Sequence, residues 1–171
     1  MNINLSQEYP EYLQVAEVQD DSKNVMIYLT SKRESAECPM CGQASNKIHK
    51  TYLRVINDMP ILVKSTRLII TIHKYCCTNE LCNQKTFLES IEDFVTPRQR
   101  RTIRLNNYLK HIAMTSTGEG GARLCKENHI KISGDTLIRI AKKFDPAETK
   151  PEMIGIDDWA YKKTEIRDND C

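Results

Sequence analysis

The sequence has few of the features that mark membrane, secreted or disordered proteins. It has no run of about 18 apolar residues, so it offers no candidate membrane-spanning helix. Its first ten residues are polar and acidic and lack the basic and then apolar pattern of a signal peptide. Glycine and proline occur only six times each, and 40% of the residues are hydrophobic, which is typical of an ordered globular chain. We therefore expect a cytoplasmic protein of one domain or of two or three small modules.

Cysteine, in contrast, is abundant, with seven residues in a chain of 171. An odd number argues against a complete set of disulfides, which are in any case rare in a reducing compartment. Cys38 and Cys41 form a Cys-x-x-Cys pair, and Cys77 and Cys82 form a second pair farther along the chain. Two such pairs predict a closed tetrahedral zinc site with four thiolate ligands.

We interpret this zinc site as structural, because it has no evident open position for a substrate. The module that carries it, residues 38–97, is small, so metal binding would supply stability that its core cannot. Cys76 competes as a ligand with its neighbour, whereas His49 and His73 each stand alone and are assigned no role. Buried free cysteines are one alternative. A redox Cys-x-x-Cys pair is another, although no thioredoxin-like pattern surrounds it.

Stretches rich in β-branched residues predict strands in the first half of the chain. Residues 12–18 and 24–30 form two strands joined by a polar turn. Residues 62–64 and 67–75 form the arms of a hairpin that leads to the second cysteine pair. We therefore expect an N-terminal β-hairpin region over residues 1–37, ahead of the β-rich zinc-binding module.

From residue 98 onward the pattern becomes helical. Apolar residues recur at helical spacing within residues 102–116, and a second short helix fits residues 120–127. Ser133 is a good N-cap for a third helix over residues 134–143. Three short helices with this spacing predict a compact bundle over residues 98–144, in which the last two helices form a helix-turn-helix.

Charge is spread unevenly, although the net charge is only +2. Residues 1–37 carry seven acids against three bases, giving −4, whereas residues 98–143 carry eleven bases against three acids, giving +8. The basic half favours double-stranded DNA as the partner, with the third helix in the major groove. An ordinary helical bundle with a solvated basic face is the alternative. The candidate DNA-contacting residues are Arg98, Arg100, Arg101, Arg123, Thr136, Arg139, Lys142 and Lys143.

Near the end of the sequence, residues 154–156 predict a short apolar strand that ends at the paired carboxylates of Asp157 and Asp158. A carboxylate at a strand end is where polynucleotidyl transferases hold a divalent metal ion. Aspartate is also commonplace at turns, so the pair becomes informative only through the modules that precede it.

Four motifs occur in a characteristic order: Cys38-Pro39-Met40-Cys41-Gly42, Tyr75-x-Cys77-x4-Cys82, Ser133-x-Asp135-Thr136-Leu137-x-Arg139 and Ile154-Gly155-Ile156-Asp157-Asp158-Trp159-Ala160. Together they resemble the ISL-three family of insertion-sequence transposases, over residues 38–163. The resemblance implies a zinc-binding domain, a helix-turn-helix that binds the terminal inverted repeats of the element, and a DDE catalytic domain of ribonuclease-H-like fold. Residues 152–171 would be the truncated start of that catalytic domain.

The resemblance makes Asp157 the first of three catalytic carboxylates, which hold two metal ions, Mg²⁺ in the full-length family enzyme. The second and third have no counterpart in this chain, so we expect it not to cut or join DNA. One permitted set of codons for residues 164–171, read one base later, encodes Arg-Lys-Tyr-Gly-Thr-Met-Ile-Val. That run resembles the family's next strand, and we hypothesise a frameshift after Lys163.

The sequence thus predicts an α+β protein with a small β-rich zinc-binding module, a three-helix helix-turn-helix domain and a vestigial start of a ribonuclease-H-like domain. The expected function is that of a transposase fragment that binds DNA for transposition. One alternative is a stand-alone zinc-containing regulator or repressor of transposition. In another alternative, the zinc module is a protein-interaction or dimerisation surface, through which the chain could form a homodimer.

Overall fold

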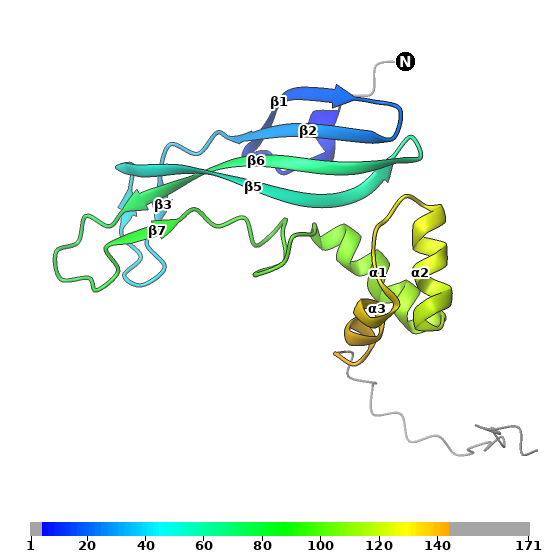
Figure 1. Ribbon diagram of the computed structural model, residues 1–171. Helices are drawn as coiled ribbons and strands as arrows, with labels where there is room; N and C mark the ends of the chain where they lie inside the picture. Colours follow the sequence, from blue (N-terminus) through cyan, green and yellow to red (C-terminus); the bar gives the residue numbers. More distant parts are fainter. Residues whose placement is uncertain (1–4, 144–171) are drawn as a thin grey trace, which may run out of the picture.

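The structure, a computed structural model, describes residues 5–143. Within these residues it has the mixed α+β architecture expected from the sequence, with a five-stranded sheet, a two-stranded sheet and three α-helices (Figure 1). The predictions for Asp157 and for residues 152–171 lie outside the described residues. Among the residues that are described, no helix is long and apolar enough to cross a membrane.

The elements follow one another along the chain as strands first and helices last. In order they are the 3-10 helix η1 (Leu5–Glu8), β1 (Leu13–Asp20), β2 (Asn24–Ser31), β3 (Ala36–Glu37), β4 (Ala44–Ser45), β5 (Ile48–Ile61), β6 (Lys64–Cys76), β7 (Thr86–Leu88), α1 (Ile103–Thr115), α2 (Gly118–Glu127) and α3 (Gly134–Ala141).

The large sheet has the strand order β1-β2-β6-β5, with β7 also paired to β6. β2 and β6 run parallel to each other, and the other neighbours are antiparallel. Alternate side chains of a strand point to opposite faces, so one face of the sheet carries the apolar core. The buried residues of that core are Tyr9, Leu13, Val25, Ile27, Leu29, Ile56, Leu68, Ile70, Ile72, Ile91, Phe94 and Val95.

The predicted hairpin near the N-terminus is confirmed as β1 and β2, with boundaries shifted by one or two residues. It is not a separate region, however. β2 pairs with β6 along seven residues, and both strands contribute side chains to one core. The boundary expected between residues 1–37 and 38–97 is therefore wrong for the sheet, because a parallel pairing between distant strands joins the two stretches.

The second hairpin also differs from the prediction. Residues 62–64 do not form its first arm; that arm is β5, which begins at Ile48. Leu62 and Val63 instead form the two-residue turn between β5 and β6, with φ angles of 51° and 59°. Both side chains are exposed, so their apolar character reflects neither burial nor strand structure.

The three helices appear where the sequence predicts them. Their N-caps are Thr102, Thr117 and Ser133, and each cap side chain accepts a hydrogen bond from a backbone N–H in the first turn. The helices share a second apolar core, formed by Leu105, Leu109, Ile112, Cys125, Ile130 and Leu137. They lie at one end of the sheet (Figure 1).

A buried carboxylate joins the helices to the sheet. Asp58 on β5 is 3% exposed and accepts hydrogen bonds from the Thr102 hydroxyl at 2.7 Å and from Arg104 Nε at 2.8 Å. A second guanidinium nitrogen of Arg104 contacts the other carboxylate oxygen, so the pairing is bidentate. The Arg104 guanidinium also lies 3.1 Å from Glu8. These contacts fix the start of α1 against the end of β5.

We expect Asp58→Ala to lower the free energy of unfolding by about 3 kcal/mol, because the substitution leaves Arg104 without its buried partner. Asp20→Ala is the matched control. Asp20 pairs with Lys64 while 48% exposed, and its loss should cost less than about 1 kcal/mol. Chemical denaturation of the metal-loaded variants measures both. Equal losses would show that the Asp58 pairing does not hold the helices to the sheet.

Candidate metal centre and basic surface

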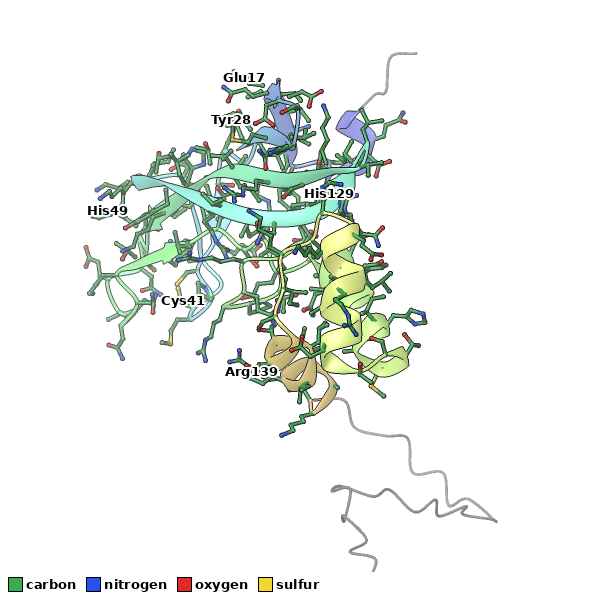
Figure 2. The ribbon with its side chains drawn as sticks, turned by 45° about the vertical axis from the view of Figure 1, so that its right-hand side comes forward. Glu17, Tyr28, Cys41, His49, His129 and Arg139 are labelled. Carbon is green, nitrogen blue, oxygen red and sulfur yellow. The ribbon has the colours of Figure 1, made fainter. Side chains whose placement is uncertain are left out.

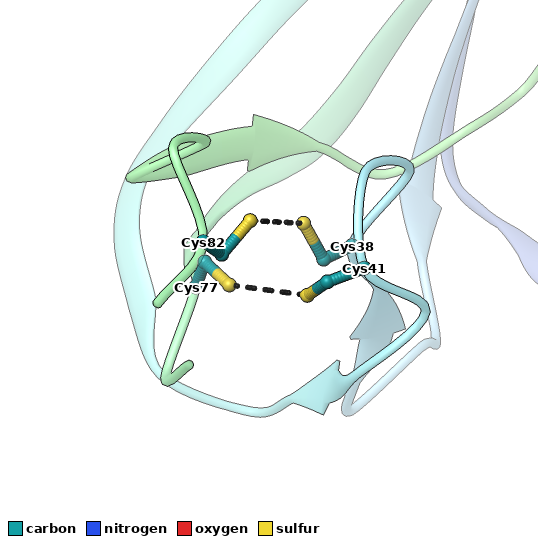
Figure 3. Close-up of side chains that lie close together, drawn as sticks. All are labelled: Cys38, Cys41, Cys77 and Cys82. Atoms are coloured by element: carbon teal, nitrogen blue, oxygen red, sulfur yellow. Dashed lines mark hydrogen bonds between the residues drawn. The ribbon is translucent and has the colours of Figure 1, made fainter. Parts of the chain in front are cut away.

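Two loops bring four cysteines together at the end of the sheet away from the helices (Figures 1 and 3). Cys38 and Cys41 belong to the loop between β3 and β4, and Cys77 and Cys82 to the loop between β6 and β7. The first loop reverses tightly, because the N–H of Gly42 donates to the carbonyl of Cys38 at 2.8 Å. Gly42 has φ +72°, a conformation in which a side chain is strained.

The four Sγ atoms all lie within 4.8 Å of one another. Cys38 Sγ is 3.9 Å from Cys82 Sγ, and Cys41 Sγ is 3.6 Å from Cys77 Sγ (Figure 3). Sulfur atoms bound tetrahedrally at about 2.3 Å from one ion would be separated by about 3.8 Å. The observed separations fit that arrangement and are far longer than a disulfide bond. The cluster could therefore hold a metal ion.

The four cysteines predicted as ligands are the four that the structure brings together. Cys76 is not one of them. It is the last residue of β6, and its N–H donates to the carbonyl of Lys47. His49 and His73, for which the sequence predicts no role, are also outside the cluster.

The thiols strongly influence one another's ionisation. The backbone N–H of Gln43 is the main cause that lowers the pKa of Cys41, to about 7. For Cys77 the backbone N–H of Asn79 favours the thiolate, but desolvation and the neighbouring thiols outweigh it and raise the pKa to about 12. Burial also raises the pKa of Cys82. Without a cation, thiolates this close together repel one another.

Aromatic side chains support the cluster from the side of the sheet. Cys38 and Cys82 are buried against Tyr75 and Phe87, whose rings stack with centroids 6.1 Å apart. The Tyr75 hydroxyl donates to the carbonyl of Arg33 at 3.0 Å, which ties the connection between β2 and β3 to β6. Both cysteine loops are thus anchored on one rigid part of the sheet.

The residues predicted to bind DNA, all basic except Thr136, lie at the opposite end, around the helices. Five of them line one hollow of about 670 Å³ between α3, α1 and residues 96–101, together with Lys110. These five are Arg101, Thr136, Arg139, Lys142 and Lys143. No acidic residue of the described chain lines this hollow.

The remaining predicted residues lie elsewhere. Arg98 and Arg100 line a second hollow of about 390 Å³, which Arg101 shares. Arg123 lies in a third hollow, between α2 and the turn that follows it, and so stands apart from the others. Arg67 and Lys131 also line the second hollow. The sequence does not predict them as DNA-contacting residues, because nothing in their local sequence apart from their positive charge indicates that role.

Comparisons of the chain with protein-family models, with curated proteins and with solved structures gave no match. The geometry of the cysteine cluster and of the basic surface therefore carries the functional argument.

We expect Cys38→Ser to abolish stoichiometric metal binding, because three thiolates and a hydroxyl hold a soft divalent ion far less tightly than four thiolates. Cys76→Ser is the matched control, since it removes the neighbouring thiol that lies outside the cluster, and it should bind one ion per chain like the parent. Mass spectrometry of the native proteins measures the metal content. If Cys76→Ser lost the ion while Cys38→Ser kept it, Cys76 rather than Cys38 would be the ligand.

Metal binding should also strengthen as pH rises. All four ligands must be deprotonated, and the pKa of Cys77 is raised well above neutrality, so the ion has to displace protons. The pKa of Cys41, at about 7, predicts that more protons are released per ion at pH 6 than at pH 8. Calorimetric titration with Zn²⁺ in buffers of different ionisation enthalpy measures that release. An affinity independent of pH would contradict thiolate ligation.

Proposed function

We propose that the chain binds double-stranded DNA with sequence specificity through α3, as the DNA-binding part of an insertion-sequence transposase, with the terminal inverted repeats of the element as its target. The observation that carries this proposal is the hollow beside α3. Arg101, Lys110, Arg139, Lys142 and Lys143 all line it, and no acid of the described chain does. The motif resemblance to the ISL-three family supports the same assignment.

The connection between α2 and α3 suits a helix-turn-helix. The N–H of Ile130 donates to the carbonyl of Cys125 at 2.8 Å, and the N–H of His129 to that of Lys126 at 3.0 Å. This Schellman pattern ends α2 sharply, with His129 in the left-handed region at φ 58°. Ile130 is buried in the helical core, so the turn holds α3 at a fixed angle.

The helices also approach one another closely. A Cβ atom at Gly134 would lie 3.0 Å from the backbone of Gly118, so a larger residue there would require the two helices to shift by a few tenths of an ångström. This packing leaves the basic face of α3 free to enter a groove of DNA. A helix that reads bases must be held rigidly, because a small shift breaks the hydrogen bonds that discriminate between them.

Arg139 is the side chain best placed to read a base. It is exposed, and its guanidinium donates to the Thr136 hydroxyl at 3.2 Å, which is itself 2.9 Å from Ser133 Oγ. These contacts limit the conformations of the guanidinium before DNA arrives. Arginine commonly makes a bidentate contact with guanine in the major groove. Lys142 and Lys143, at the end of α3, suit phosphate contacts.

We propose zinc as the ion of the cysteine cluster, in a structural role. Four thiolates complete a tetrahedral shell and leave no position for water or substrate. The cluster lies at the end of the sheet away from α3, so it stabilises the two loops rather than acting on DNA at the helices. Bound zinc would contribute directly to the stability of the folded protein.

The proposal is tested by selecting sites from a pool of random-sequence duplexes and then measuring affinity as a function of salt. A specific site should bind at least about a thousandfold more tightly than random duplex. Enrichment of no sequence, together with no detectable binding to duplex DNA, would refute the proposed function.

We expect Arg139→Ala to weaken binding to the selected site by about tenfold to a hundredfold, with little change in binding to random duplex, because a base contact contributes only to specificity. Lys32→Ala is the matched control, since Lys32 is an exposed cation just beyond β2 and distant from α3. It should leave both affinities nearly unchanged. A uniform loss on all duplexes would show that Arg139 contacts phosphate instead.

A further inference from the structure

The segment between the sheet and the helices is held rigidly and is strongly basic. Its backbone pairs with the edge of β5, since the N–H of Asn57 donates to the carbonyl of Arg100 at 2.9 Å and the N–H of Thr102 to that of Asn57 at 3.1 Å. Arg98 lies in the left-handed region at φ 59°. Residues 98–101 therefore keep a fixed shape, with three arginines on a short stretch of chain.

Arg101 stands out among these residues because it is half-buried without a counter-ion. Its Nε atom is buried and has no hydrogen-bond acceptor within the described part of the chain. The guanidinium donates to the neutral side-chain amide of Gln99 at 3.1 Å, and no carboxylate of residues 5–143 forms an ion pair with it. Burial lowers the pKa of Arg101, which reflects the cost of holding this charge partly out of water.

Arg101 also separates two hollows. On one side lies the hollow beside α3, and on the other the hollow of about 390 Å³ at the junction with the sheet. The second hollow collects cations from three separate segments. These are Arg67 from β6, Arg98 and Arg100 from the connecting segment, and Lys131 from the turn before α3. Within residues 5–143 the only acid that lines it is Asp58, whose charge Arg104 already balances.

This hollow and the hollow beside α3 share Gln99 and Arg101, so an anion bound at the junction would lie on a surface continuous with the one beside α3. His129, which also lines the hollow, lies next to the sheet in Figure 2, whereas Arg139 lies at the far end of the helices. The cationic surface thus extends from α3 across residues 98–101 to the sheet. A DNA backbone that flanks the major groove follows such a path.

We propose that Arg101, with Arg67, Arg98, Arg100 and Lys131, forms a binding site for backbone phosphates of double-stranded DNA at the junction between the sheet and the helices. This inference rests on the proposed function, and it makes the sheet part of the DNA interface. A phosphodiester supplies the counter-ion that Arg101 lacks, since its charge balances the partly desolvated guanidinium and its oxygens accept hydrogen bonds from the terminal guanidinium nitrogens.

The first test compares two double variants that remove equal charge. Arg67→Gln with Lys131→Gln should weaken binding about tenfold on the selected site and on random duplex alike, and should make the slope of log affinity against log salt shallower by about 2. Lys32→Gln with Lys50→Gln removes two exposed lysines at the end of the sheet away from the helices, one just after β2 and one near the start of β5, and should change affinity less than about twofold. Equal effects of the two double variants would overturn the site.

The second test examines Arg101 itself in the absence of DNA. Inorganic phosphate, compared with chloride at equal ionic strength, should raise the melting temperature of the parent more than that of Arg101→Gln. Arg101→Gln in chloride should melt at or above the parent temperature, because it removes a desolvated charge without a partner. A marked fall would assign Arg101 a purely structural role and overturn the proposal.

The outcomes separate the two proposals. If duplex binding depends on Arg139 but not on Arg67 and Lys131, the phosphate site is refuted and the proposed function stands. If phosphate stabilises the parent through Arg101 while both double variants bind DNA equally, the hollow is an anion site that DNA does not use, and the inference again fails. If the parent binds no duplex, both proposals fall.

Discussion

The carboxylate of Asp58 lies where the two cores of the molecule meet, and the orientation of the helices depends on it. The sheet and the helices have separate apolar cores, and among the residues of the sheet Met59 on β5 packs against the helical core. The bidentate contact with Arg104 and the hydrogen bond from Thr102 supply the directional constraint. Thr102 is also the N-cap of α1, so one carboxylate fixes both the position and the start of that helix.

The hairpin of β5 and β6 connects this joint to the cysteine cluster. β6 ends at Cys76, immediately before Cys77 of the cysteine cluster, and β5 carries Asp58 near its other end. The two long paired strands therefore connect the cysteine loops to the helices. The candidate metal centre thus lies at one end of the hairpin, and the contact that holds the start of α1 lies toward the other.

Features encoded by nearby residues were predictable, and features that require distant segments to meet were not. The spacing of Cys38 and Cys41, the cap at Ser133 and the apolar periodicity of α1 are local signals, and the structure agrees with each. The turn at Leu62 and Val63 was missed because two-residue hairpin turns usually contain asparagine or glycine. The parallel pairing of β2 with β6 has no local signal at all. The same reason explains why Arg67 and Lys131 could not be recognised as neighbours of one hollow.

Arg101 and Arg104 are close in the sequence but differ in whether a carboxylate balances their charge. They are three residues apart, and both are partly withdrawn from water. Arg104 has a buried carboxylate partner, which raises its pKa, whereas burial lowers the pKa of Arg101, which has no such partner among the described residues. A desolvated cation without an anion lowers stability, so folding alone does not account for arginine at position 101. The difference between the two arginines is what identifies the junction as a place where an anion from outside the chain completes the structure.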